Sequence, residues 1–310
     1  MADLLLAIVG PTATGKTEVA ILLAEAIGGE IVSADSMQVY RGMEIGTAKP
    51  SPEQLARVPH HLIDIIDPDA PFSVADYQER ARGAIDGIRG RGRQPILVGG
   101  SGLYVRAVID GLGFSMAPPD PELRRRLSEQ AGTAGLAALH ARLAQVDPEA
   151  AQRIHVNDKK RIIRALEVFE QTGLPISRLQ DLDRQHRARY NTRQFGLTLA
   201  RDELYRRIEA RVDEMVRRGL VDEVKRLLDR GYGERHVSMK GLGYAQLTPF
   251  VRGECSPEEA VARLKRDTRR FAKRQLAWFR ADPRIEWIDV SAVGGYQQVA
   301  DIIRGRWEEQ

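Results

Sequence analysis

Residues 4–17 read LLLAIVGPTATGKT. The first part, 4–9, is an uninterrupted apolar run, which is typical of a strand buried inside a parallel sheet. The second part, 10–17, fits the pattern G-x-x-x-x-G-K-[ST]. Apolar residues at helical spacing follow over 15–27. Because strand, glycine turn and helix come in this order, the stretch predicts a phosphate-binding loop (a P-loop) at the carboxyl end of a buried strand.

The chemistry of such a loop explains its residue types. Glycines let the backbone curl so that its N–H groups face phosphate oxygens, and the N-terminus of the following helix adds its positive dipole end. The Lys16 ammonium can neutralise terminal phosphates, and the Thr17 hydroxyl is placed to bind Mg²⁺. The residues predicted to bind a pyrophosphate or nucleotide are Gly10, Pro11, Thr12, Ala13, Thr14, Gly15, Lys16 and Thr17. The motif predicts a phosphate site and leaves the reaction open.

Strand and helix patterns alternate further along the chain. We expect strands at 31–32, 95–98, 194–200 and 285–290, and helical segments at 74–90, 203–230 and 257–281. From about residue 120 to 190, beyond Pro118-Pro119, the pattern is helical only. We therefore predict an α/β fold: a P-loop NTPase-like parallel sheet core formed by 1–116 and 194–310, with basic helices in its second part, interrupted by an all-helical insertion domain, 117–193.

The composition is that of a globular protein, with 310 residues, 43% hydrophobic and 29% charged. No apolar run approaches the roughly 20 residues that span a bilayer, so we expect a cytoplasmic protein with no membrane partner. The single cysteine, Cys255, excludes an internal disulfide and any multi-cysteine metal site. Residues 1–119 carry a net charge of −4, whereas 120–195 and 196–310 each carry +4. This favours a polyanionic partner such as nucleic acid, although solvated arginine-rich helices would give the same charges.

A second candidate motif, 33–40 (SADSMQVY), follows the second predicted strand. Ligands of open α/β sheets bind outside the carboxyl ends of the strands, so Asp35 is expected close to the phosphate loop. Its carboxylate can hold Mg²⁺ through water or act as a general base toward an incoming nucleophile. The alternative is that Asp35 and Ser36 only cap a turn or a helix.

Two shorter segments fall at similar places. The small residues of 99–104 (GGSGLY) follow the third strand. They predict either room for a substrate at the same edge or an ordinary strand-to-helix turn. We interpret His60 and His61 as structural, because adjacent histidines on a regular element cannot both face one metal.

Two stretches are strongly basic: 158–164 (DKKRIIR) and 265–280 (KRDTRRFAKRQLAWFR). On a helix three arginines of the second stretch align at i, i+4 spacing, namely Arg266, Arg270 and Arg274. Phe271 and Trp278 share another face, and we expect both in the core. The cations suit either contact with a phosphate backbone or a solvated surface.

Taken in order, the motifs of this chain resemble the successive signatures of one family, the bacterial tRNA dimethylallyltransferases, also called tRNA isopentenyltransferases or IPP transferases. The segments that carry the resemblance are GPTATGKT (10–17), SADSMQVYRGMEIGTAKP (33–50), VPHHLID (58–64), GGSGLY (99–104), NDKKRIIRALEV (157–168), RIEARVDEM (207–215), KGLGYAQ (240–246) and KRQLAWFR (273–280). The resemblance covers nearly the whole chain. Ser101 stands where the family usually has threonine, which keeps the hydroxyl.

The resemblance implies a reaction. A dimethylallyl group passes from dimethylallyl pyrophosphate to the exocyclic N6 of the adenosine on the 3′ side of the anticodon, in tRNAs that read codons beginning with U. Pyrophosphate is released and no ATP is consumed. The implied partners are the tRNA anticodon stem-loop and dimethylallyl pyrophosphate, with Mg²⁺ as cofactor. We expect the protein to act as a monomer.

The resemblance also implies residue roles. Asp35 takes the proton from N6 or orients the amine, and Lys16 with Mg²⁺ at Thr17 stabilises the leaving pyrophosphate. Thr12 and Arg211 match catalytic positions near the donor. The flipped adenosine and its anticodon arm are held by residues spread over the chain: Asp35, Ser36, Met37, Gln38, Ser101, Lys160, Arg161, Arg164, Lys240, Gly243, Tyr244, Lys273, Arg274, Gln275 and Arg280.

Other functions use the same loop. A small-molecule or nucleotide kinase would hold ATP there, and an RNA-binding NTPase would couple nucleotide turnover to RNA affinity. An enzyme that prenylates free adenine nucleotides is a closer alternative than either of these, because it would use the same prenyl donor. The basic segments favour tRNA over a small acceptor.

Overall fold

The computed structural model describes residues 4–112, 117–185 and 190–309, with side chains described except over 182–185. The chain divides into two compact units. The first comprises Met1–Ile109 and Tyr190–Gln310, and the second is Asp110–Arg189. The sequence predicts 117–193 for the inserted domain, and residues 113–116 and 186–189, next to the two predicted boundaries, lie outside the described residues.

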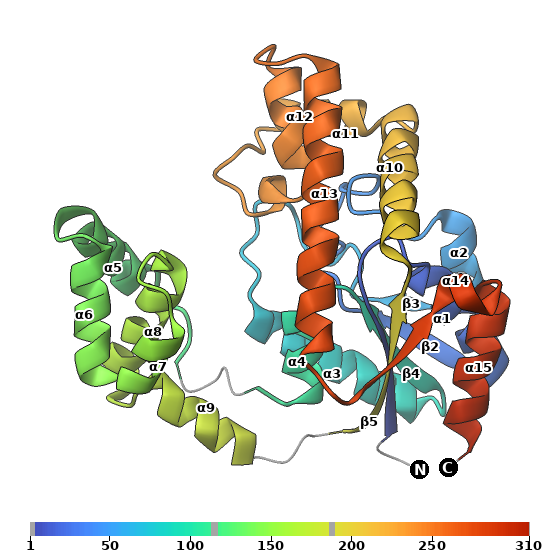
Figure 1. Ribbon diagram of the computed structural model, residues 1–310, viewed down its shortest axis with the longest axis horizontal. Helices are drawn as coiled ribbons and strands as arrows, with labels where there is room; N and C mark the ends of the chain where they lie inside the picture. Colours follow the sequence, from blue (N-terminus) through green and yellow to red (C-terminus); the bar gives the residue numbers. More distant parts are fainter. Residues whose placement is uncertain (1–3, 113–116, 186–189, 310) are drawn as a thin grey trace. The chain divides into compact units, whose positions relative to one another are not determined.

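The first unit is built on a six-stranded parallel sheet with the order β3-β2-β4-β1-β5-β6 (Figure 1). The strands are β1 (Leu4–Val9), β2 (Gly29–Ser33), β3 (His60–His61), β4 (Gln94–Gly99), β5 (Asn191–Thr198) and β6 (Ile285–Asp289). The predicted α/β fold with a parallel sheet is confirmed. Strand β5 begins three residues before the predicted start at 194, and β3 was not predicted as a strand because it has only two residues, both histidine.

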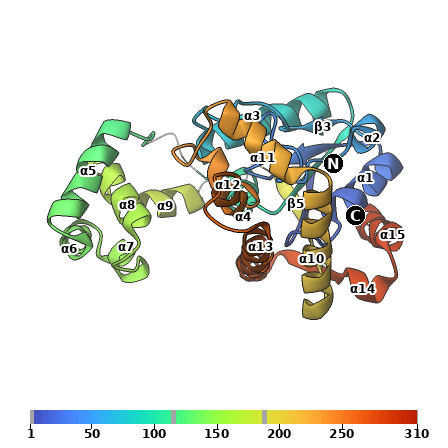
Figure 2. The same ribbon diagram turned by 90° about the horizontal axis from the view of Figure 1, so that it is seen from above.

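Strand β1 is central and buried on both faces, which explains its continuous apolar run. On one face Leu6 and Ile8 pack with α1 (Lys16–Ile27) and α15 (Tyr296–Glu308), which lie side by side in Figure 2. On the other face Leu5, Ala7 and Val9 pack with α3 (Val74–Gly90) and α4 (Gly102–Ile109). The sheet is therefore the middle layer of three, and its carboxyl edge is free to carry a site.

A lobe of helices adjoins that edge and has its own core. It contains α10 (Arg201–Arg217), α11 (Leu220–Asp229), the short 3₁₀ helix η1 (Ser238–Lys240), α12 (Tyr244–Val251) and α13 (Pro257–Arg280). The segment predicted helical over 203–230 comprises two helices, because Gly219 adopts a left-handed φ of +95° between them. Two short helices, α2 (Pro52–Arg57) and α14 (Val290–Val293), complete the unit.

In its described residues, 110–112 and 117–185, the second unit has helices and no strand, as predicted for the insertion. They are α5 (Pro121–Thr133), α6 (Leu136–Val146), α7 (Pro148–Arg153), α8 (Lys159–Thr172) and α9 (Ile176–Gln185). Leu127, Leu143 and Leu166 form the centre of its core. Across the parts of both units that the structure describes, every helix is too short or too polar to cross a membrane.

Candidate functional site

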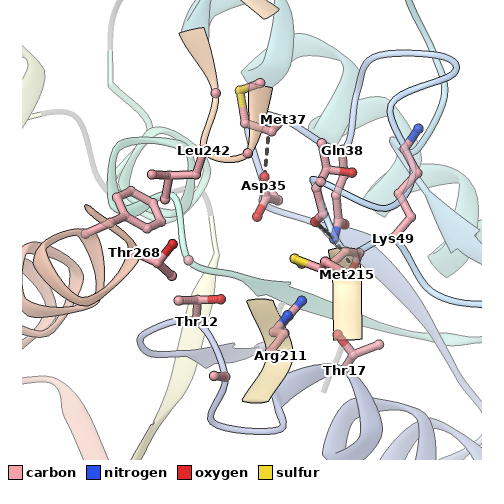
Figure 3. A pocket seen from close by; sticks show the side chains of 18 of the residues that line it. Thr12, Thr17, Asp35, Met37, Gln38, Lys49, Arg211, Met215, Leu242 and Thr268 are labelled. Atoms are coloured by element: carbon pink, nitrogen blue, oxygen red, sulfur yellow. Dashed lines mark hydrogen bonds between the residues drawn. The ribbon is translucent and has the colours of Figure 1, made fainter. Parts of the chain in front are cut away.

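A cleft of about 1110 Å³ lies at the carboxyl edge of the sheet, and Figure 3 shows it from close by. Its floor is the P-loop between β1 and α1 and the turn after β4, 99–101. Its walls are the segment after β2, 35–38, the loop 45–50, and faces of α10 and α13. Residues from distant parts of the sequence therefore meet around one space, as expected for the carboxyl ends of parallel strands.

The P-loop is held by its own backbone conformation. Gly10 follows β1 with φ +135°, and a Cβ there would lie 2.4 Å from the carbonyl oxygen of Leu197 on β5. Ala13 and Gly15 are left-handed, with φ of +66° and +90°. The Thr14 hydroxyl donates to the carbonyl oxygen of Pro11 at 3.0 Å. Only a residue without a side chain fits at Gly10, which explains the motif's first glycine.

A buried amide ties the P-loop to the turn after β4. The side-chain oxygen of Gln275, on α13, accepts the backbone N–H of Thr12 at 2.9 Å, and its nitrogen donates to the carbonyl oxygen of Gly100 at 3.0 Å. Gln275 is 7% exposed. Its amide is used on both sides, so the contribution that we predicted it to make to tRNA binding would come from positioning these turns.

Two cations face the cleft from different elements. Burial lowers the pKa of Lys16 to about 7, with nearby Arg211 adding to the effect and Asp35 opposing it. Burial also lowers the pKa of Arg211, against the effect of Asp35. The Lys16 ammonium folds back over the loop and donates to the carbonyl oxygen of Pro11 at 2.6 Å. Two half-buried basic groups therefore face a single carboxylate, and a bound anion would favour their charged forms.

Asp35 caps a turn and also lines the cleft. One carboxylate oxygen accepts the backbone N–H of Met37 at 2.8 Å, so the residue does cap a turn (Figure 3). The carboxylate also lines the cleft, where Figure 3 shows it around the same space as Thr12 and Arg211. Burial raises its pKa, while the Met37 hydrogen bond and the charge of Lys16 act in the opposite direction. A carboxylate withdrawn from solvent in this way holds a proton more readily than an exposed one.

The segment after β2 is braced by two neighbours. The hydroxyl oxygen of Ser101 accepts the backbone N–H of Ser36 at 2.9 Å, which joins the ends of β2 and β4. The Gln38 amide nitrogen donates to the carbonyl oxygens of Thr47 and Ala48 at 3.4 and 3.2 Å. Ser36, Gln38 and Ser101 thus lie in the cleft as predicted, and their polar groups set the shape of its wall.

The other predicted tRNA contacts fall into three groups. Lys240, Gly243 and Arg274 line the cleft. Lys273 and Arg280 are exposed on α13, as are Lys160 and Arg161 at the start of α8 in the second unit. Two residues are engaged internally: Arg164 binds Glu167 and the carbonyl oxygen of Ala117, and Tyr244 is fully buried with its hydroxyl on Glu223. For all three groups, direct contact with RNA stays a prediction.

Helix α13 corrects one expectation. Arg266, Arg270 and Arg274 are all exposed along it, as the spacing predicted. Neither aromatic expected in the core lies there: Phe271 is half-buried and lines the cleft, and Trp278 is 40% exposed, whereas Phe279 is buried. The Trp278 ring lies against Gly102 at the start of α4, where a Cβ would approach it to 2.2 Å. The position of α4, rather than the spacing within α13, sets which aromatic is covered.

The two adjacent histidines have structural partners. They form β3, paired with Ile31 and Val32 of β2. His61 Nε2 lies 2.7 Å from the carboxylate of Glu30, and His60 Nδ1 lies 2.8 Å from the carbonyl oxygen of Val58. Among the described residues no group of three or more His, Cys, Asp or Glu side chains could hold a metal ion.

Sequence reasoning missed two supports of the site. Glu223 holds the loop 44–46 from α11, and Tyr296 packs its ring where a Cβ on Gly15 would lie 2.2 Å away. Both contacts join residues far apart in the sequence, and neither residue stands in a local motif. No pattern in the sequence could have found them.

Comparisons with known proteins agree on one family. The family model described as IPP transferase matches residues 38–282. The tRNA dimethylallyltransferase of Desulforudis audaxviator is 56% identical over 307 residues, covering 99% of this chain and 98% of the relative. That of Geobacter sulfurreducens is 53% identical over 288 residues, covering 93% and 92%.

Solved structures match as well. The full-length tRNA isopentenylpyrophosphate transferase of Bacillus halodurans is 45% identical, with a TM-score of 0.71 over 99% of this chain and 97% of that one. A eukaryotic dimethylallyltransferase acting on tRNA is 25% identical, with a TM-score of 0.85 over 99% of this chain and 79% of that one.

Proposed function

This chain belongs to the IPP transferase family, and from that premise we propose that its cleft binds dimethylallyl pyrophosphate and tRNA together. The protein is a tRNA dimethylallyltransferase, as its relatives at 50–56% identity are named. The finer proposal is that the acceptor is N6 of the adenosine on the 3′ side of the anticodon, in tRNAs reading codons that begin with U. The observation that carries the proposed prenyl transfer is the meeting of Lys16, Arg211 and Asp35 around one cleft.

The donor end is the P-loop. Its backbone N–H groups, with the ammonium of Lys16 and the guanidinium of Arg211, would bind the pyrophosphate. The C1–O bond of the donor breaks, and its electron pair stays on the pyrophosphate oxygen. Because this leaving group gains negative charge as the bond breaks, cations held in place beforehand lower the barrier. Thr12, on the same loop, would support the pyrophosphate.

The acceptor end is Asp35. The N6 lone pair forms the new bond to C1, and the amine becomes acidic as it does so. Asp35 would accept that proton, since burial raises its pKa while Lys16 and Arg211 favour the ionised carboxylate. The site therefore places a proton acceptor and the counter-charges of the leaving group in one cleft.

The residues present fit a magnesium ion. Thr17 lines the cleft at the start of α1. Mg²⁺ usually keeps several waters and binds through few protein oxygens together with substrate phosphates, so a single hydroxyl ligand beside the P-loop is compatible with it. The Thr17 hydroxyl would hold it together with the pyrophosphate. When bound, Mg²⁺ would neutralise part of the charge on the leaving group.

The basic residues of α13 and α8 would hold the anticodon arm by its phosphates. Proteins read single-stranded RNA loops by taking unstacked bases into pockets, and a base whose exocyclic amine reacts must leave its stack. At about 1110 Å³, the cleft has enough volume to take in an unstacked base. A monomer acting in the cytoplasm remains part of the proposal.

A transfer assay tests this function. Purified protein, Mg²⁺ and labelled dimethylallyl pyrophosphate are mixed with unmodified tRNA that has adenosine beside its anticodon. We expect label in that tRNA, and none in a matched tRNA with guanosine at the same place or in free AMP. ATP hydrolysis, or phosphate transfer to a small acceptor, in place of labelled RNA would contradict the proposal.

A further inference from the structure

The loop between β2 and α2 has an anchor that the mechanism above leaves unused. Glu223, on α11, is 1% exposed, and its carboxylate accepts three consecutive backbone N–H groups. One oxygen accepts those of Glu44 and Ile45 at 3.0 and 2.9 Å, and the other accepts that of Gly46 at 3.0 Å. The second oxygen also accepts the Tyr244 hydroxyl at 2.7 Å.

These four hydrogen bonds define the conformation of the loop. A buried carboxylate is costly unless donors surround it, and hydrogen bonds to an ionised acceptor are stronger than neutral ones. Three donors come from successive residues of one loop, so the carboxylate binds a single backbone shape. Gly46 faces the Tyr244 ring, where a Cβ would lie 2.6 Å from the ring carbon that bears the hydroxyl. The loop is therefore fixed both by the carboxylate and by the tyrosine beside it.

The other side of the same loop forms the wall of the cleft. Thr47 and Ala48 line it, and their carbonyl oxygens accept hydrogen bonds from the Gln38 amide at 3.4 and 3.2 Å. The Gln38 side-chain oxygen in turn accepts the Ser33 hydroxyl at 2.9 Å. A continuous set of hydrogen bonds thus leads from Glu223, through the loop, to the two ends of the turn that carries Asp35.

We propose that Glu223 is a positioning residue for the acceptor half of the reaction. It holds the loop 44–48, and through Gln38 it fixes the segment 35–38 against the incoming adenosine. The inference rests on the proposed function, in which Asp35 receives the N6 proton. The donor half has separate supports, since the P-loop is tied to Gln275 and Gly100. Loss of Glu223 should therefore affect the tRNA side and spare the pyrophosphate side.

The test is steady-state kinetics of Glu223→Gln with each substrate varied in turn. This variant keeps the size of the side chain but turns an NH₂ group toward backbone donors. We expect kcat/KM for tRNA to fall on the order of 10-fold to 100-fold, the range for a small misplacement of reacting groups. KM for dimethylallyl pyrophosphate and Kd for inorganic pyrophosphate should stay within about twofold of wild type.

Two further variants separate positioning from general destabilisation. Gly46→Ala pushes the same loop away from Tyr244 without changing the carboxylate, so it should give the same loss confined to the tRNA side. Glu30→Gln is the matched control: this buried carboxylate, 6% exposed, binds Arg91 and His61 near the opposite end of β2. It should lower the melting temperature and leave both KM values unchanged. If Glu223→Gln fails to fold, Gly46→Ala carries the test.

Either of two results would overturn the inference. One is wild-type kcat/KM for tRNA in folded Glu223→Gln or Gly46→Ala. The other is a rise of comparable size in KM for dimethylallyl pyrophosphate or in Kd for inorganic pyrophosphate, which would mean a general effect on the cleft. A wild-type protein that transfers no dimethylallyl group would instead refute the proposed function.

Discussion

The ionisation of Lys16 gives the most direct test of the donor end. Its pKa in the free protein is about 7, because of burial first and the charge of Arg211 second. A bound pyrophosphate favours the charged ammonium, so the pKa of Lys16 must be higher in the complex than in the free protein. By linkage, binding takes up a proton above pH 7 and weakens as the pH rises.

The magnitude follows from the titration of one group. With a pKa of about 7, roughly nine-tenths of Lys16 is charged at pH 6 and roughly one-tenth at pH 8. If the anion binds the charged form, Kd rises about tenfold between these values, or about 1.4 kcal/mol. The stability of the ligand-free protein depends on pH in the opposite direction to pyrophosphate binding. In the unfolded chain Lys16 has the ordinary lysine pKa of 10.5 and binds more protons above pH 7, so this residue makes stability rise with pH from about 7 to 10.5.

The assay is calorimetric titration with inorganic pyrophosphate, without metal, at pH 6, 7 and 8. Lys16→Gln is the control, because pyrophosphate itself titrates in this range and the variant has no ammonium. The ratio of variant Kd to wild-type Kd isolates Lys16, and it should shrink about tenfold from pH 6 to pH 8. A ratio that stays constant over this range would refute the reasoning, since Lys16 would then keep one charge state or lie away from the anion.

Three other predictions concern single residues. Asp35→Asn should abolish transfer while tRNA affinity stays nearly intact, as measured by single-turnover kinetics and filter binding; wild-type turnover would remove Asp35 from proton transfer. Arg274→Ala should weaken tRNA binding and reduce the slope of log Kd against log salt by about 1. Arg252 is an exposed arginine paired with Glu234, and as a control Arg252→Ala should leave the slope unchanged. Equal slopes for the two variants would give Arg274 a structural role. Gly10→Ala should lower the free energy of unfolding, measured by urea titration, by about 2 kcal/mol or more, since its Cβ would meet the Leu197 carbonyl oxygen. It should also weaken pyrophosphate binding. Gly90→Ala, whose Cβ would have nothing within 4 Å, should be neutral or slightly stabilising in that titration.

Local patterns predicted much of the fold. The run at 4–9 and the helix after it are where the sequence placed them, because burial on both faces and helical spacing are properties of short segments. The predictions were wrong where packing between distant segments determines which side chains are buried and which residues pair as strands. Trp278 shares the periodicity of a buried face, yet it is 40% exposed because only the start of α4, at Gly102, lies against its ring. Strand β3 is only two residues long and pairs with β2.

The P-loop could be predicted from the sequence alone. Its glycines, its lysine and its place between a strand and a helix lie within fourteen residues, so the motif could be recognised without knowing that Gly10 also packs against Leu197 of β5. Family membership was also readable, because the order of several motifs is a property of the sequence alone. Both follow from information that is local or linear along the chain.

The electrostatics of the site and the contacts that support it depend on how distant segments pack together. Arg211 lowers the pKa of Lys16 from a helix almost two hundred residues away, Gln275 ties the P-loop to the turn after β4, and Glu223 holds the loop beside Asp35. Desolvation depends on what surrounds a charge, and a hydrogen bond on a meeting of two groups within about 3 Å. Neither the desolvation of a charge nor a hydrogen bond between distant groups follows from the spacing of residues along one segment. Both depend on the packing of the helical lobe against the edge of the sheet.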